Sequence, residues 1–98
     1  MAFLSFMDAA LEEARQAGDR GEVPVGAVVG NGKGRGIARA GNETRALNDP
    51  TAHAEMLAIR AACEVLEMER LIGHDLYVTL APCPMCAGAI AAARINRL

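Results

Sequence analysis

Tryptophan is absent from this 98-residue sequence, and only three residues are aromatic: Phe3, Phe6 and Tyr77. So few rings exclude a broad platform on which successive bases of a single strand would stack. No apolar stretch approaches the roughly 20 residues that a helix needs to cross a bilayer. The first residues show neither a basic leader nor a cleavage site, so we expect a cytoplasmic protein with no membrane segment.

Lysine is nearly absent as well. Lys33 is the one lysine among ten basic residues, and twelve acidic residues bring the net charge to −2. Charge alone therefore does not indicate a nucleic-acid-binding protein. The other basic residues are scattered arginines, which favour forked hydrogen bonds over diffuse attraction, and most are explained as solvated surface residues.

Cysteine is scarce too, with Cys63, Cys83 and Cys86 as the full set. Three cysteines, two of them spaced as metal ligands, indicate a reducing compartment rather than a disulfide framework. Cys63 falls in an apolar helical pattern, where a small core residue is the simpler interpretation. A chain of this length predicts one small domain, residues 1–98.

Four residues in two short segments have the chemistry of a metal site. His53 and Glu55 form a His-x-Glu sequence, and Cys83 and Cys86 lie in Pro-Cys-x-x-Cys. One imidazole and two thiolates can hold zinc at three corners and leave the fourth for water. A closed structural site would need a fourth cysteine or histidine, and the remaining ones lie at neither usual spacing. The set predicts one catalytic Zn²⁺ per chain, with Glu55 as a proton carrier beside the bound water.

The rest of the chain alternates helical and strand patterns. In chain order we expect a helix at 5–17, a hairpin of strands 25–29 and 35–40, a helix at 53–66, a strand at 75–80, a helix at 83–93 and the start of a strand at 95–98. The last strand, helix and strand imply a right-handed parallel crossover. The fold class is therefore α/β, with a layered sheet.

The spacing of the metal ligands suits two helix N-termini. Side chains in a first turn lean back toward the N-terminus, so His53 and Glu55 can both face a metal beyond the helix end. Cys83 and Cys86, three apart, are neighbours on one face of the next helix. The exposed N–H groups of both helices favour anions, which lowers thiol pKa values.

Several stretches around these motifs resemble the zinc-dependent cytidine and deoxycytidylate deaminase superfamily, whose signature is His-x-Glu followed by Pro-Cys-x-x-Cys. Within it, the chain is most similar to the bacterial tRNA-specific adenosine deaminases. The matching stretches are residues 23–28, Asn42, residues 48–55, residues 76–80 and residues 82–90. The resemblance implies the three-layer α/β/α cytidine-deaminase-like fold, truncated before its last strands and helices.

The resemblance also implies a reaction: hydroxide formed at the zinc attacks C6, Glu55 shuttles the proton, and the wobble adenosine in a tRNA anticodon loop becomes inosine. It implies that Asn42 hydrogen-bonds the base and that backbone N–H groups near Ala54 orient the ring. Val25 and Pro82 are its expected pocket walls. The family usually has glutamate where this chain has Ala81, which bears on substrate ordering rather than on the metal.

Two other functions stay open at this point. The same zinc chemistry serves deaminases of free guanine, free cytosine or nucleosides, and the acidic balance suits a small substrate. The chain could instead be a non-catalytic, zinc-stabilised module. If the substrate is tRNA, Arg45, Arg94 and Arg97 are candidate phosphate contacts.

The helices expected at 53–66 and 83–93 are apolar nearly all round. One side of each covers the sheet, and the other side needs a further partner because a helix that is apolar all round is buried. We expect a two-fold homodimer through these helices, as the resemblance also implies, with cover from a further C-terminal segment as the alternative.

Overall fold

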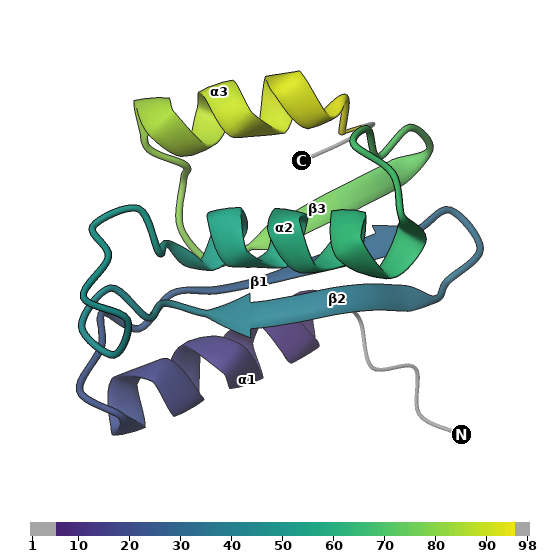
Figure 1. The fold of residues 1–98 in the computed structure, drawn as a ribbon. Helices are drawn as coiled ribbons and strands as arrows, with labels where there is room; N and C mark the ends of the chain where they lie inside the picture. The colour runs from purple at the N-terminus through teal and green to yellow at the C-terminus, as the bar shows by residue number, and fades with distance from the viewer. Residues whose placement is uncertain (1–5, 96–98) are drawn as a thin grey trace.

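The computed structural model describes residues 6–95, which form three helices and three strands (Figure 1). In chain order these are α1 (Phe6–Asp19), β1 (Gly26–Asn31), β2 (Gly36–Gly41), α2 (Ala54–Leu66), β3 (His74–Val78) and α3 (Pro84–Ala93). None of the helices in this part of the chain is long and apolar enough to cross a membrane.

The three strands form one sheet in the order β2-β1-β3. Both pairings are antiparallel: Val28 lies opposite Arg39 on β2 and opposite Tyr77 on β3. The β1–β2 hairpin has a register shift after Val29. Its turn is closed by the side-chain oxygen of Asn31, which accepts hydrogen bonds from the N–H groups of Lys33 and Arg35. The central strand β1 is therefore hydrogen-bonded along both edges.

Helices cover both faces of this sheet, so the three-layer α/β/α prediction is confirmed (Figure 1). α1 lies under the sheet, and α2 lies over it, mainly on β2 and β1. α3 lies beside α2 in the upper layer and makes its helix-to-element contacts with α2 alone. This helix, which begins after Cys83 and carries Cys86, is thus attached through α2 and, at its last residue, through the Ala93 carbonyl, which accepts the N–H of Leu71.

Alternation along β1 divides its side chains between the two layers. Ala27 and Val29 belong to the core beneath α2, whereas Val28 lies with Phe6 and Ala9 on the α1 side. Ala54, Ala58 and Ala62 recur every four residues on α2 and are fully buried. Their small side chains let α2 lie close to the sheet.

Close approach also explains one glycine of β1. A Cβ atom at Gly26 would overlap the carbonyl oxygen of Ala10 and crowd the backbone nitrogen of Ala14. The backbone of β1 therefore lies directly against α1, which fixes the start of β1 against the middle of that helix.

The sequence boundaries need small corrections. α1 continues to Asp19, two residues past the expected end, because the glycine that ends it is Gly21, with φ 84°. β3 ends at Val78, although Thr79 still exchanges hydrogen bonds with Gly26. The strand expected at 95–98, with its parallel crossover, lies outside the described residues except for residue 95.

Candidate metal centre and active site

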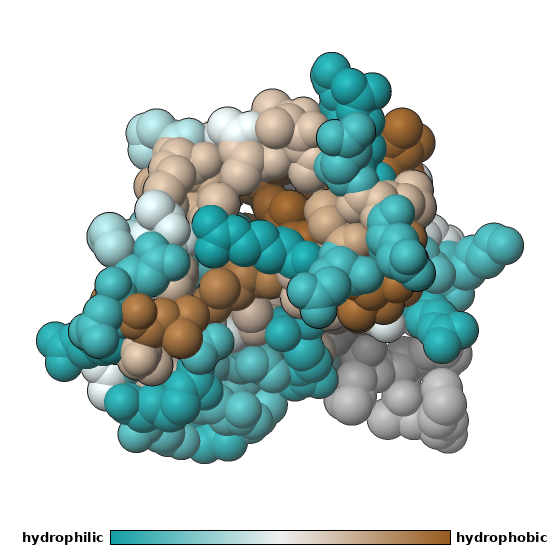
Figure 2. All heavy atoms as spheres, in the orientation of Figure 1, coloured by the Kyte–Doolittle hydropathy of each residue, from teal (hydrophilic) through white to brown (hydrophobic). Residues whose placement is uncertain are grey.

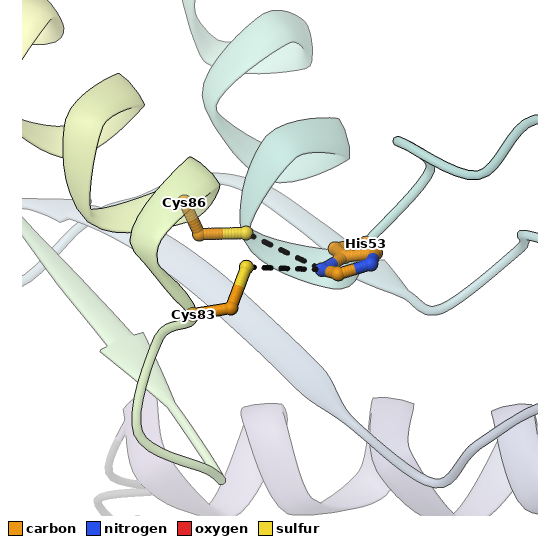
Figure 3. A group of neighbouring side chains, drawn as sticks. All are labelled: His53, Cys83 and Cys86. Carbon is orange, nitrogen blue, oxygen red and sulfur yellow. Dashed lines mark hydrogen bonds between the residues drawn. The ribbon is translucent and has the colours of Figure 1, made fainter.

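Three metal-ligating side chains meet where α2 and α3 begin (Figure 3). His53 is the residue that caps α2, Cys83 caps α3, and Cys86 follows in the first turn of α3. Their ligand atoms all lie within 4.8 Å of one another. Both sulfurs face the same ring nitrogen: His53 Nδ1 lies 3.5 Å from Cys86 Sγ and 3.7 Å from Cys83 Sγ.

Local sequence explains why the two capping residues face each other. His53 and Cys83 both have extended backbone conformations, and neither side chain caps its own helix. Pro84 occupies the first helical position of α3, where its missing N–H costs no hydrogen bond. The imidazole and the thiol are therefore left to project beyond the helix ends.

The two thiols differ in acidity when no metal is bound. The backbone N–H of Cys86 hydrogen-bonds the sulfur of Cys83 and lowers the pKa of that thiol. Burial raises the pKa of Cys86 to about 12, and its hydrogen bond with Cys83 and the charge of Glu55 act in the same direction. A cation between the sulfurs would oppose the rise at Cys86 and add to the lowering at Cys83, because it stabilises thiolate.

The donor set fits zinc in number, type and spacing. Zinc bonds of about 2.05 Å to nitrogen and about 2.3 Å to sulfur, at a tetrahedral angle, hold those two atoms about 3.6 Å apart. The separations of 3.5 and 3.7 Å lie on either side of that value. Among residues 6–95 the cluster has three members, so a tetrahedral ion would keep one position for water or substrate.

A cavity of about 210 Å³ opens beside this cluster. Its lining consists of Val23, Val25, Asn42, His53, Glu55, Leu80, Ala81 and Cys83. The fold thus brings two of the metal donors, the expected proton carrier Glu55 and two of the four expected substrate-binding residues to one place.

Glu55 lies in the first turn of α2 and is only 4% exposed. A carboxylate that is so well buried and borders the cavity is rarely a mere helix-start residue, since burial of a charge is costly without a partner or a role. Its charge also acts on the thiol of Cys86, which places it next to the metal donors.

Asn42 is held on the cavity wall by its backbone. Its N–H donates to the carbonyl of Val25 at 3.1 Å, and the Arg20 guanidinium donates to its carbonyl at 3.4 Å. Its side-chain Nδ2 lies 3.4 Å from the hydroxyl of Thr44. The residue itself is 6% exposed.

The other two expected substrate residues, Ala54 and Pro82, are not among the residues that line this cavity. The side chain of Ala54 is fully buried in the core, which leaves its backbone, the part expected to orient the base, as the group that could meet a substrate. Pro82 does not line the cavity; it borders two neighbouring hollows, one along α3 and one along β3. Both residues adjoin metal ligands in the sequence, which does not determine the direction in which a side chain points.

Sequence reasoning missed three lining residues: Val23, Leu80 and Ala81. Val23 and Leu80 are 59% and 61% exposed, so they form an aliphatic rim at the mouth of the cavity. Two features of the sequence could have pointed to the first and last of these residues: Val23 falls within a stretch that resembles the family, and Ala81 departs from the family pattern. Leu80 was assigned to a strand, where an apolar residue needs no other explanation.

Other candidates lie apart from the metal centre. Arg45 is exposed on the loop between β2 and α2, and Arg94, with φ 61°, ends α3. Arg97 lies outside the described residues. Cys63 is half-buried on α2 beside the hydrophobic core, and burial raises the pKa of its thiol, as expected for a packing residue.

Comparison with known proteins places the chain in a family. The family model for the cytidine and deoxycytidylate deaminase zinc-binding region matches residues 3–98. The chain belongs to this family. Its matched region is the zinc-binding one, in agreement with the cluster of one histidine and two cysteines.

Relatives within the family share much of the sequence. The tRNA-specific adenosine deaminase of Agrobacterium fabrum is 66% identical over 93 residues, which cover 95% of this chain and 60% of the relative. That of Aquifex aeolicus is 50% identical, over 95% of this chain and 61% of the relative. The chain therefore spans about 60% of the length of these curated relatives.

Solved structures agree with this fold. One, from a study of A-to-I editing by tRNA:A34 deaminases, superimposes with a TM-score of 0.92 at 66% identity, covering 95% of this chain and 67% of the other. Guanine deaminase from Bacillus subtilis gives a TM-score of 0.91 at 42% identity, covering 99% of this chain and 62% of the other. The fold is thus common to deaminases of different substrates.

Proposed function

We propose that this chain is the zinc-binding, catalytic part of a hydrolytic deaminase that converts adenosine to inosine at the wobble position of tRNA. The observation that carries the proposal is that Glu55 and Asn42 line the same cavity as the metal donors His53 and Cys83. Relatives named as tRNA-specific adenosine deaminases, up to 66% identical, support adenosine in tRNA as the substrate.

His53, Cys83 and Cys86 hold the zinc ion in this proposal. When bound, zinc lowers the pKa of a coordinated water and so supplies a nucleophile at neutral pH. Because the cluster has three protein ligands among residues 6–95, a tetrahedral ion held by them would have one position left for water, and the cavity lined by His53 and Cys83 would supply the space for it.

Glu55 moves the protons. It takes one from the attacking water, whose oxygen bonds to C6, and delivers it to the adjacent ring nitrogen. It then transfers the second water proton to the amino group, the C6–N bond breaks, and ammonia leaves. Water and adenosine are thereby converted to inosine and ammonia. The burial of Glu55 suits this work because a carboxylate shielded from bulk water exchanges its proton with the bound reactant.

The cavity walls hold the base. Asn42 hydrogen-bonds the edge of the ring, backbone N–H groups at the start of α2 near Ala54 orient it, and Val25 forms an apolar wall. Pro82 lies at the edge of the neighbouring hollows, so we give it no contact with the base. An adenosine in a single-stranded loop can leave its stack at low cost and enter such a cavity.

Arg45 and Arg94 are exposed and are the phosphate contacts that we propose for the flanking anticodon loop. A tRNA substrate and reduced thiol ligands both suit the cytoplasm, which we propose as the site of action.

We further propose a two-fold homodimer. Met85, Ala87, Gly88, Ala91 and Ala92 leave an apolar surface exposed on α3, and tan apolar atoms cover this helix at the top of Figure 2. A continuous apolar face of this kind favours burial against a partner. Sedimentation of the zinc-loaded chain at micromolar concentration tests it: a dimer is expected, and a monomer that binds no hydrophobic dye would contradict it.

A free base is the second candidate substrate, because the guanine deaminase of Bacillus subtilis has nearly the same fold at 42% identity. The cavity volume of about 210 Å³ would admit adenine or guanine. A non-catalytic zinc module is the third candidate, favoured by the position of Ala81, which gives the cavity wall a methyl group where the resembled family has a carboxylate.

One experiment separates the three functions. The zinc-loaded chain is incubated with a tRNA that carries adenosine 34, with free guanine and with free cytosine, and ammonia and inosine are measured. Inosine in the tRNA is expected. Turnover of a free base with untouched tRNA supports the second candidate, and no turnover by either the chain or its Glu55→Ala variant supports the third.

A further inference from the structure

Glu22 is a buried carboxylate with no part in the proposed chemistry. It lies between the end of α1 and β1 and is 7% exposed. It takes part in none of the ion pairs formed within residues 6–95. Such burial is costly unless the charge is well solvated by hydrogen-bond donors.

Its donors are two consecutive backbone N–H groups of the loop between β2 and α2. Arg45 N–H donates to Oε1 at 3.1 Å, and Ala46 N–H donates to Oε2 at 2.9 Å. Hydrogen bonds from N–H groups to an ionised carboxylate are stronger than neutral ones. The segment before β1 and the loop after β2 thus lie side by side at the left of Figure 1 and are joined by this carboxylate.

The loop so held carries site residues at both ends. It starts at Asn42, which lines the cavity, and ends at His53. The two ends are held together by a hydrogen bond from Glu43 N–H to the carbonyl of Ala52, at 3.0 Å. Thr44, whose hydroxyl lies 3.4 Å from Nδ2 of Asn42, directly precedes the two residues that Glu22 binds. Glu22 itself adjoins Val23 on the rim of the cavity.

We propose that Glu22 is a positioning residue: by holding the backbone at Arg45 and Ala46 it keeps Thr44, and through it the amide of Asn42, aligned on the cavity wall. The inference rests on the proposed function for its effect on turnover, but the clamp itself does not. Although His53 ends the same loop, its carbonyl accepts the N–H of Leu57 at 3.0 Å as the start of α2, so we expect zinc binding to survive the loss of the Glu22 contacts.

A double-mutant cycle tests the role in the zinc-loaded chain. Glu22→Gln removes the charge and one acceptor oxygen, and we expect kcat/KM for the tRNA adenosine to fall about tenfold. Asn42→Ala lowers kcat/KM on its own, and adding Glu22→Gln to it should cause little further loss, because Glu22 acts through Asn42. Glu12→Gln, which removes an exposed carboxylate from α1, is the matched control and should leave kcat/KM unchanged. Fully additive losses would overturn the proposal.

A second readout does not depend on activity. In ¹⁵N NMR spectra, Glu22→Gln should speed hydrogen exchange of the Arg45 and Ala46 amides and shift the side-chain NH₂ signals of Asn42, with β1 amides and zinc content unchanged. If the wild-type chain deaminates nothing, the proposed function fails and these spectra alone decide the clamp. Unchanged exchange at Arg45 and Ala46, or unshifted Asn42 signals, would overturn it.

Discussion

At the scale of single residues, the side chains that donate to a metal were predictable and the side chains that surround a substrate were only partly so. His53, Cys83 and Cys86 could be identified because ligand chemistry is tied to residue type and short spacing. Val23 and Leu80 could not, since β1–β3 pairing brings together segments more than fifty residues apart. No local pattern marks an aliphatic side chain as the rim of a cavity.

The first prediction concerns Glu55. Glu55→Gln keeps the size of the side chain but cannot carry the proton, so turnover of the tRNA adenosine should fall by about 10²–10⁴-fold. Zinc content, measured by atomic emission, should stay at one ion per chain because Glu55 is not one of the three donors. A variant that keeps more than half of the wild-type turnover would remove Glu55 from the mechanism.

At the scale of helices and strands, the sequence predicted the elements and their order, and missed where some of them end. α1 runs two residues past its expected end, and the chain turns out of the helix at Gly21, whose left-handed backbone conformation cannot be read from its residue type alone. The hairpin of β1 and β2 was predicted, but the place of β3 on the other edge of β1 was beyond reach, because a continuous apolar run shows that β1 is buried and not which strand lies on its far edge.

The second prediction tests the contact between α1 and β1. Gly26→Ala places a methyl group against the Ala10 carbonyl, and the free energy of unfolding should fall by about 1–3 kcal/mol. The control is Gly18→Ala on α1, whose added methyl group would meet only an ordinary contact with Pro24, so this change should be neutral or slightly stabilising. Chemical denaturation of both variants measures the difference; equal stability would show that α1 can move away without cost.

At the scale of the whole molecule, acid should destabilise the fold. Hydrogen bonds from the Thr51 hydroxyl and N–H lower the pKa of Asp49. Burial alone would raise the pKa of Glu22, but the hydrogen bonds from the N–H groups of Arg45 and Ala46 lower it overall. A lowered folded-state pKa gives stability that is present above the unfolded value, about 4, and is lost as pH falls through the folded value. Urea unfolding between about pH 5 and 2 should show this loss, with a shallower slope for Asp49→Asn; an unchanged slope would argue against it.

Metal removal is the last prediction. Zinc binds the folded chain through segments thirty residues apart, so a chelator should lower the free energy of unfolding, by about 4 kcal/mol where free zinc exceeds Kd a thousandfold. For a domain of this size each kcal/mol corresponds to roughly 4–8 °C in Tm. Calorimetry with and without chelator measures the shift, and Cys86→Ala should melt at the same temperature under both conditions.

The way in which α3 is attached has a consequence for the lifetime of the protein itself. Two of the three zinc ligands lie at the start of this helix, while α2 and the hydrogen bond from Leu71 N–H to the Ala93 carbonyl hold the rest of it, so the ion fastens its N-terminal end to the fold. Without the ion, residues 80–83, which lie between the hydrogen-bonded Thr79 and α3, would open and become the first site of proteolysis. At a constant rate of synthesis, the amount of this protein in a growing cell would then follow the supply of zinc.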